Sequence, residues 1–310
     1  MMSTKPNSTP IRVTTYNVLS SHLGGADYYT SCKPEWLDPA YRFRQLKSKL
    51  DAEIDKEAII CLQEVSTLWG GSLYAYFANK GYVFVNTNYG NKFNGYMGVG
   101  IAVPRHRYVI EDVDITRIAD TKMTVRQPKP PVILQLIKSW LIDPTIRLLR
   151  SLSILKPYEG TPWEMALNRH NQMLSIRLRA ITTNNITTDD ASVLQVDNTA
   201  NDVNNNSNVN SDSTLLATNS NQSFVVGTYH MPCMFKLPGV MLIHTALSAQ
   251  HIQRYSKGDP YLFLGDFNFK PRDTTYKLVT TGKVDSAVSE YTTFTVLVCT
   301  TTLYCPTTAY

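Results

Sequence analysis

The sequence predicts a mixed β-sandwich core that is covered by helices, and three observations support this fold class. Short segments rich in β-branched and aromatic residues recur along the 310-residue chain. Amphipathic helical segments separate some of these strands, whereas other strands follow one another as hairpin-like pairs. A simple parallel sheet needs a crossover between every two strands, so this mixture favours mixed sheets with helices outside. The length suffices for one large α/β domain or two small ones.

The composition is that of an ordinary globular protein, with 43% apolar residues and 10% aromatic residues. A net charge of +5 permits a phosphate-rich partner without requiring one. The five cysteines form no CxxC pair, so we expect reduced thiols in an intracellular protein of the cytoplasm or nucleus. The N-terminus lacks an apolar signal segment, and no uncharged apolar run approaches the roughly 18 residues of a membrane span.

The chain begins with residues 1–10, whose composition predicts a disordered leader. The β-branched segment from Ile11 to Leu19 predicts a strand that ends near Asn17. An amide at this position often does no more than terminate a strand. It is also suited to bind a metal ion or to hydrogen-bond an acidic ligand, so both interpretations stay open.

A helix and a buried strand come next. The segment from Tyr41 to Glu57 places apolar residues on one face at helical spacing. The continuous apolar run from Ala58 to Leu62 predicts a buried strand, and Gln63 and Glu64 follow it directly. A carboxylate at the end of a buried strand is costly unless it is paired or bound to a metal. Glu64 is therefore a candidate metal ligand, with a structural role as the alternative.

Four further elements are expected before residue 119. They are a helix over 66–80 and strands over 82–86, 99–103 and 108–118. Gly81 ends the helix, Pro104 stops the second of these strands, and the alternation of apolar and polar residues in the third suits an edge strand.

Two insertions interrupt the domain. Residues 119–165 contain a basic, apolar stretch whose spacing predicts two short amphipathic helices broken at Pro144. These helices would pack on the domain, or residues 131–155 would contact a membrane surface or a partner. Residues 182–222 are rich in Asn, Thr, Ser and Asp, and this composition predicts disorder.

The second half of the domain also ends its strands in polar residues. The segment from Asn171 to Ala180 alternates in character and predicts a half-buried strand, and the strand from Ser223 to Tyr229 ends at His230. A helix is expected over 241–255. A lone histidine is more often structural. His230, however, comes at the end of a predicted buried strand, just as Glu64 comes after another, so it is a candidate for the site.

The strongest signal is the segment from Tyr261 to Asn268. Its first four residues are apolar and predict a buried strand, and Gly265 allows a tight exit. Asp266 and Asn268 are two residues apart, so in an extended chain their side chains leave on the same side. They would bind a hard cation and hold a phosphoryl oxygen, or they would form Asx-turns in a loop. A short helix over 274–281 ends at Gly282.

Asn17, Glu64, His230, Asp266 and Asn268 each end or closely follow a predicted strand. If these strand ends converge, they form a site with two carboxylates, two amides and one imidazole. Such a site suits Mg²⁺ and a phosphoester. The sequence contains no P-loop, HExxH or GxSxG motif, so it does not support an NTPase, a zinc protease or a serine hydrolase.

Four motifs follow one another along the chain: TYNVL (15–19), LQEV (62–65), TYH (228–230) and GDFN (265–268). In this order they resemble the endonuclease/exonuclease/phosphatase superfamily. Other stretches are similar to its deadenylase, nocturnin and Angel branch. These are Tyr29-x-x-Cys32-x-x-x-Trp36-Leu37 with Tyr41-Arg42, Arg169-His170-Asn171, and Ser286-Ala287 followed by Thr292-Thr293. The likeness covers residues 11 to 295, interrupted by the two insertions.

The resemblance implies a four-layered α/β sandwich and a phosphodiesterase or phosphatase that depends on Mg²⁺ or Mn²⁺. Transferred motif by motif, it makes Glu64, Asn17 and Asp266 the metal-binding residues. It assigns catalytic roles to His230, Asp266 and Asn268. The phosphate- or substrate-binding positions that it implies are Asn171, His230 and Asn268.

The C-terminal part departs from the pattern of that branch, where a core-strand Asp and a terminal Asp-His pair follow the Ser-Ala and Thr-Thr stretches. Here no histidine follows His251 and no aspartate follows Asp285. We therefore expect the last strands of the fold to be absent or replaced, with a divergent tail over 296–310. We also expect the chain as given to bind Mg²⁺ weakly and to hydrolyse phosphoesters poorly or not at all.

The leading functional hypothesis is a Mg²⁺-dependent phosphodiesterase that acts on RNA as a deadenylase-like 3′-5′ exoribonuclease. The same site would also serve a phosphatase that acts on a small nucleotide or phosphorylated metabolite. A different class of function is a catalytically impaired module that binds RNA or a protein partner.

Overall fold

A computed structural model describes residues 10–121, 160–181 and 223–283 of the chain, with short pieces at 132–137, 139–140 and 143–145. Several sequence-based predictions lie outside these residues. They concern the leader apart from its last residue, the 182–222 insertion, the Ser286-Ala287 and Thr292-Thr293 stretches, and the 296–310 tail.

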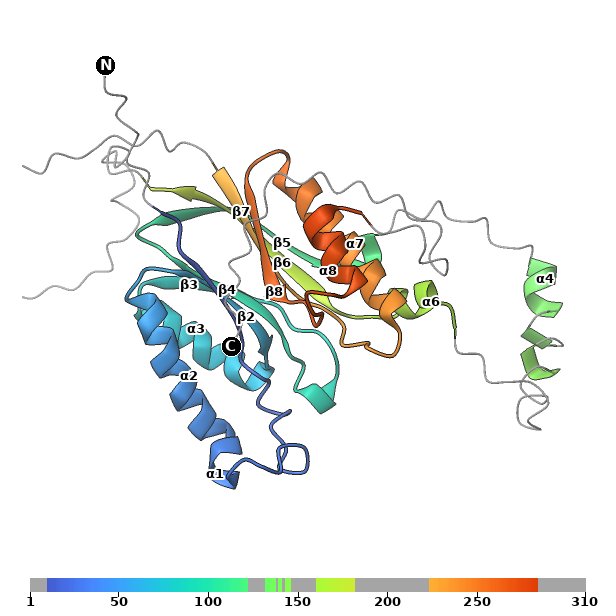
Figure 1. Cartoon of the computed structure of the whole chain (residues 1–310), viewed down its shortest axis with the longest axis horizontal. Coiled ribbons are helices and arrows are strands. Elements are labelled where there is room, and N and C mark those ends of the chain that lie inside the picture. The colour runs from blue at the N-terminus through green and yellow to red at the C-terminus, as the bar shows by residue number, and fades with distance from the viewer. Residues whose placement is uncertain are drawn as a thin grey trace, which may run out of the picture.

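Two four-stranded mixed sheets form the centre of the described chain (Figure 1). Sheet A has the order β1-β2-β4-β3 and sheet B the order β5-β6-β7-β8. The strands are β1 (Val13–Asn17), β2 (Ile59–Val65), β3 (Tyr82–Asn86), β4 (Gly98–Pro104), β5 (Tyr108–Arg117), β6 (Gln172–Ala180), β7 (Ser223–His230) and β8 (Tyr261–Asp266). The helices are α1 (Pro34–Leu37), α2 (Pro39–Ile54), α3 (Thr67–Asn79), α4 (Val132–Ile137), α6 (Pro162–Leu167), α7 (Pro238–Ser256) and α8 (Thr274–Thr281).

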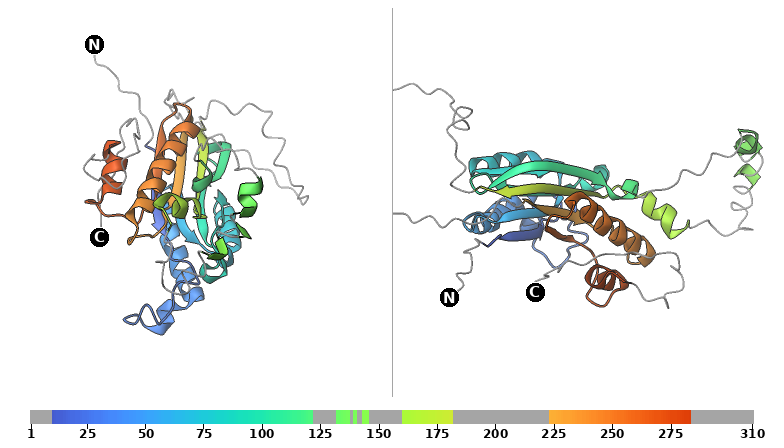
Figure 2. Two further views of the ribbon diagram at one scale, coloured as in Figure 1. Left: turned by 90° about the vertical axis from the view of Figure 1, so that its right-hand side faces the viewer. Right: turned by 90° about the horizontal axis from the view of Figure 1, so that it is seen from above.

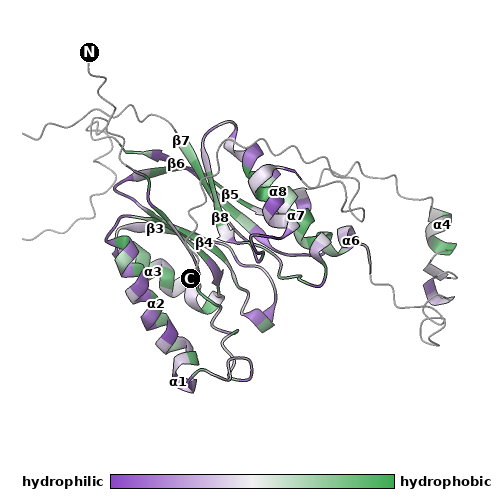
Figure 3. Cartoon of the chain, viewed as in Figure 1, coloured by the Kyte–Doolittle hydropathy of each residue, from purple (hydrophilic) through white to green (hydrophobic). Residues whose placement is uncertain are grey.

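The layers follow from the alternation of side chains along the strands. In β2, Ile60 and Leu62 pack against α2 and α3, whereas Ile59 and Cys61 face sheet B. On the other side, α7 covers sheet B through Val240 and its neighbours. The hydropathy colouring shows the apolar residues on the strands and a largely hydrophilic α2 (Figure 3). The views in Figure 2 show the sheets stacked between the helices. The predicted four-layered sandwich is confirmed.

Each sheet contains one parallel pair of strands joined by a helix. β1 and β2 are parallel and α2 connects them, whereas β7 and β8 are parallel and α7 connects them. β1 also lies beside β8, so the two units meet between the sheets. Because the carboxyl ends of parallel strands lie at one edge of a sheet, the residues that end these four strands converge.

Two predictions about strand burial are wrong. β6 was expected to be half-buried, but Met173 and Ser175 lie under α7 while Leu174 and Ile176 face sheet A, so both faces are covered. β8 was expected to be buried, yet all six of its residues are partly exposed. The reason is that β8 is an edge strand, which pairs only with β7 among the described residues.

Several element boundaries also differ from the predictions. β2 continues through Gln63 and Glu64 to Val65, and the 20–39 loop contains the short helix α1. Within the 119–165 insertion the structure has the short helix α4, on which Leu136 and Ile137 are exposed. A contact of this region with a membrane or partner stays a prediction. None of the described helices has both the length and the apolar character needed to cross a membrane.

Candidate active site

Four of the predicted site residues meet where the two sheets join. The Nδ2 atom of Asn17 donates hydrogen bonds of 2.8 Å to Glu64 Oε1 and 2.8 Å to Asp266 Oδ2. His230 Nε2 lies 3.8 Å from Glu64 Oε1 and 4.0 Å from Asp266 Oδ2. Asn17 and Glu64 come from sheet A, whereas His230 and Asp266 come from sheet B. The sandwich therefore brings together residues that lie up to 249 positions apart in the chain.

The backbone around this cluster is in uncommon conformations. Leu19, Glu64 and Asn268 have φ angles of +53°, +59° and +53°, which non-glycine residues seldom adopt. The register between β2 and β4 shifts between Gln63 and Val65, so Glu64 occupies a bulge. A bulge redirects a side chain, and such conformations cost about 1–3 kcal/mol each and cluster at functional sites.

Gly265 is required for β8 to approach β7 closely. Its φ is +149°, and a Cβ atom at this position would lie 1.9 Å from the carbonyl oxygen of Tyr229. A side chain there would push the two strands apart. Because Asp266 comes directly after it, this glycine sets the position of the carboxylate relative to His230.

Backbone amides orient the two acids and the amide between them. Ser20 N donates to Glu64 Oε2 at 3.1 Å, and Asn268 N donates to Asp266 Oδ1 at 3.0 Å. Leu19 N donates to Asn17 Oδ1 at 2.9 Å, so the amide nitrogen of Asn17 is the atom that faces the carboxylates. Asn17 thus contacts the acids as a donor, and its predicted role as a metal ligand stays a prediction.

His230 is buried at the back of the cluster, with 8% of its side chain exposed. Burial lowers its pKa, while the charges of Glu64 and Asp266 act in the opposite direction. Its Nδ1 atom has no hydrogen-bond partner among the described residues. The main chain here is held from two sides, because Asn171 Nδ2 donates to the carbonyl oxygen of His230 and Asn268 Nδ2 donates to that of Met231.

Two polar side chains that the sequence analysis did not assign to the site support it from sheet A. Gln63 is 1% exposed and donates through Nε2 to Thr228 Oγ1 at 2.9 Å, which ties β2 to β7 across the sandwich. The guanidinium group of Arg42 donates to the carbonyl oxygens of Val18 and Leu19 and packs over the ring of Trp69. Arg42 thereby holds the loop whose Ser20 amide binds Glu64. Both residues lie within motifs named in the sequence analysis, LQEV and Tyr41-Arg42, but only the fold shows what they contact.

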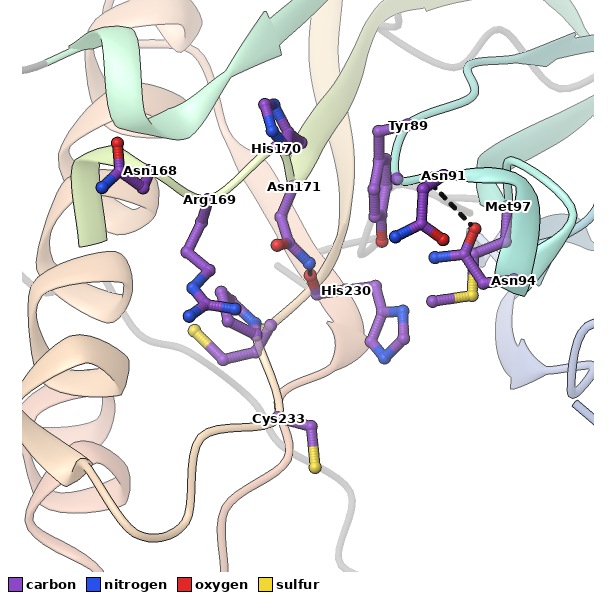
Figure 4. Close-up of a pocket in the computed structure, with 13 residues that line it drawn as sticks. Tyr89, Asn91, Asn94, Met97, Asn168, Arg169, His170, Asn171, His230 and Cys233 are labelled. Carbon is purple, nitrogen blue, oxygen red and sulfur yellow. Dashed lines mark hydrogen bonds between the residues drawn. The ribbon is translucent and has the colours of Figure 1, made fainter. Parts of the chain in front are cut away.

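A cavity of about 270 Å³ opens beside His230, and the close-up shows the side chains that line it (Figure 4). His230 and Asn171 form part of its wall, and the binding role that the resemblance implies for Asn171 stays a prediction. The rest comes from the loops that precede β4, β6 and α7. The other lining residues are Tyr89, Gly90, Asn91, Asn94, Met97, Asn168, Arg169, His170, Met231, Pro232 and Cys233.

The cluster fits a divalent cation. Glu64, His230 and Asp266 offer ligand atoms that all lie within 4.8 Å of one another. In the described part of the chain, neither carboxylate forms an ion pair with a lysine or an arginine. Two such acids beside a buried imidazole need a compensating positive charge. Carboxylate oxygens are the ligands that hard cations such as Mg²⁺ prefer, although the identity of the ion stays a prediction.

No protein-family model and no curated protein match the sequence. Solved structures do match, with 15% identity and a TM-score of 0.53 over 87% of this chain for ANGEL2, a 2′,3′-cyclic phosphatase crystallised with adenosine-2′,3′-vanadate. The human Nocturnin catalytic domain with bound sulfate matches with 14% identity and a TM-score of 0.51 over 88% of this chain. This chain spans 57% of the ANGEL2 chain and 69% of the Nocturnin chain. The chain therefore shares the fold of ANGEL2 and Nocturnin, as the resemblance in the sequence predicted.

Proposed function

We propose that this protein is a metal-dependent phosphoester hydrolase that acts on a nucleotide or RNA substrate, with 3′-5′ exoribonuclease activity of the deadenylase type as its leading form. The observation that carries this proposal is the cluster of Glu64, His230 and Asp266 around the amide of Asn17. The fold shared with ANGEL2 and Nocturnin supports the same class of reaction.

Each residue of the cluster has a role that its contacts suggest. Glu64 and Asp266, aligned by Asn17, would hold Mg²⁺ or Mn²⁺, and a bound ion of this kind stabilises negative charge on phosphoryl and leaving oxygens. Asp266 would orient the attacking water and accept its proton, because its other oxygen is already fixed by the Asn268 amide. His230 would donate a hydrogen bond to the phosphate.

A phosphatase that acts on a small nucleotide is the second candidate. The size of the cavity favours the phosphatase, because its volume of about 270 Å³ is close to the lower end of the roughly 300–1,000 Å³ that is usual for small-molecule sites. ANGEL2, which shares the fold, is a 2′,3′-cyclic phosphatase, and this also favours a phosphatase.

A substrate panel with and without Mg²⁺ tests both candidates. It contains oligo(A), mixed RNA, a 2′,3′-cyclic nucleotide, a nucleotide 2′-phosphate and abasic DNA. We expect slow Mg²⁺-dependent hydrolysis of oligo(A) that Asp266→Asn abolishes and that the exposed control Asp55→Asn retains. Cleavage restricted to the small nucleotides would favour the phosphatase. Binding of oligo(A) without cleavage of any substrate would contradict an enzyme and favour a non-catalytic RNA-binding module.

A further inference from the structure

The cavity beside the cluster has the chemical character of an anion site. Four asparagine side chains line it, together with Arg169 and His170, and no carboxylate of a described residue does. An arginine keeps its positive charge at any ordinary pH and offers five N–H donors. Figure 4 shows Arg169 extending alongside Asn171 toward the chain segment that follows His230.

The charge of Arg169 is not used within the described protein. No described carboxylate forms an ion pair with it, and its Nε atom is buried without a hydrogen-bond partner. The three arginines within the strands of sheet B are all paired, because Arg117 binds Asp120, Arg177 binds Asp259 and Arg179 binds Glu111. Buried donors in native proteins nearly always have partners, so an unsatisfied arginine that lines a cavity indicates a ligand.

The backbone that carries Arg169 is fixed from outside the cavity. Arg117 donates through Nε to the carbonyl oxygen of Arg169 at 2.8 Å and through Nη2 to that of Leu167 at 2.6 Å. One turn earlier, His244 Nε2 lies 3.0 Å from the carbonyl oxygen of Ala166. These contacts hold the loop in place before any ligand arrives, which lowers the entropic cost of binding.

We propose that Arg169 binds a second phosphate of the substrate, next to the phosphoester that reacts at Glu64, His230 and Asp266. This inference rests on the proposed function, since it names the class of substrate for the same site: a nucleotide or oligonucleotide with two phosphates in succession. The second phosphate would come either from the same nucleotide or from the next residue of an RNA strand. Both sources present the same pair of anionic oxygens to the guanidinium group.

Equilibrium binding in EDTA tests the role of Arg169 separately from hydrolysis, because no divalent ion is then present to support turnover. Calorimetry compares adenosine 5′-monophosphate with adenosine 3′,5′-bisphosphate and with the dinucleotide pApA, for wild type, Arg169→Gln and Arg105→Gln. Arg105 follows β4 at the end of sheet A away from Glu64, and its substitution removes the same charge. Charge-assisted hydrogen bonds of this kind change affinity by roughly 10- to 150-fold.

We expect wild type and Arg105→Gln to bind a two-phosphate ligand at least about 10-fold more tightly than the monophosphate. Arg169→Gln should lose this preference. A preference for the bisphosphate alone places both phosphates on one nucleotide, and a preference that extends to pApA indicates a strand. Three results would overturn the proposal. Wild type and Arg169→Gln could prefer the two-phosphate ligand equally, Arg169→Gln and Arg105→Gln could lose the preference equally, or wild type could show no preference. Loss of hydrolysis in Mg²⁺ with intact preference would instead reject only the proposed activity.

Discussion

The two halves of the molecule hold their parts of the site in different ways. In sheet A, Glu64 has 11% of its side chain exposed and lies in a bulge of a fully buried strand. In sheet B, Asp266 has 32% of its side chain exposed and ends the edge strand β8. Both sheets pack on their helices through apolar contacts and also form polar contacts with them. In sheet A, Thr14 donates to Glu53 of α2, whereas in sheet B Tyr229 and Asp114 contact histidines of α7.

This difference separates two ways to position an acid. Glu64 depends on a strained backbone inside a packed layer, so its position resists change even when its charge is removed. Asp266 depends on how closely an open edge strand approaches its neighbour, so its position is sensitive to packing. Substitutions at Glu64, Gly265, His244 and Asp114 test this contrast.

The carboxylate of Glu64 should matter for the metal and little for the fold. Glu64→Gln preserves volume while removing charge, so we expect metal-dependent hydrolysis to fall by about 10²–10³ or more. The free energy of unfolding in EDTA should change by less than about 1 kcal/mol, because the substitution also removes the repulsion between the negative charges of Glu64 and Asp266. Hydrolysis assays and melting curves with and without Mg²⁺ measure both. An unchanged Mg²⁺-induced rise in Tm would remove Glu64 from the metal site.

The edge strand should be sensitive at Gly265. Gly265→Ala places a Cβ 1.9 Å from the Tyr229 carbonyl oxygen, so we expect a loss of about 3 kcal/mol or more in the free energy of unfolding. The control is Gly71→Ala in α3, where a Cβ would meet no atom within 4 Å and the helix should become slightly more stable. Urea midpoints measure both variants. A midpoint for Gly265→Ala equal to that of wild type would show that β8 adjusts freely.

The polar contacts of sheet B should make its stability depend on pH through His244. Its Nε2 faces the Ala166 carbonyl oxygen and its Nδ1 lies 2.7 Å from the Tyr229 hydroxyl. A carbonyl only accepts, so Nε2 carries the proton and the tyrosine donates to Nδ1. Burial is the main reason that the pKa of His244 is lowered to about 4, and the charges of Arg169 and Arg117 lower it further.

Because the folded chain binds this proton less readily than the unfolded chain, stability should fall as the pH drops from about 6.5 to about 4 and then level off. The full loss from this group is about 3 kcal/mol, and His244→Gln should remove it from the pH profile. NMR titration of the folded protein is the independent check. An imidazole that titrates near its ordinary pKa would contradict the assignment.

The smallest expected effect is that of the Asp114–His251 pair, in which His251 Nε2 lies 2.7 Å from Asp114 Oδ2. Burial raises the pKa of Asp114, but the hydrogen bond with His251, the charge of His251 and the hydrogen bond with Thr116 together more than offset this, so the net pKa is lowered. Asp114→Asn should therefore cost about 1 kcal/mol at neutral pH, and the cost should shrink as the pH falls through the folded pKa. Asp120→Asn, whose carboxylate is 64% exposed, should cost almost nothing. Equal costs for the two substitutions would show that the contact between Asp114 and His251 of α7 is not stabilising.

The residues of the candidate site could be predicted because each strand ends in a polar side chain directly after an apolar run. Asn17, Glu64, His230 and Asp266 stand in such positions, and the structure brings all four together. Arg169 was predicted only as part of a motif next to Asn171. Nothing in the sequence around it shows that its charge would have no partner, because pairing depends on residues far away in the chain.

Most strands and helices could be placed from the sequence, because periodicity and turn residues act over a few positions, and β3 and α8 have the predicted limits. Which faces are buried depends on how the elements pack together. β6 is covered on both sides because α7 packs on it, and β8 is partly exposed because it is an edge strand. The position of Glu64 within a strand also depends on packing, since the bulge there requires pairing with β4. Burial and strand register depend on residues that are distant in the chain, and a local sequence pattern does not show which residues those are.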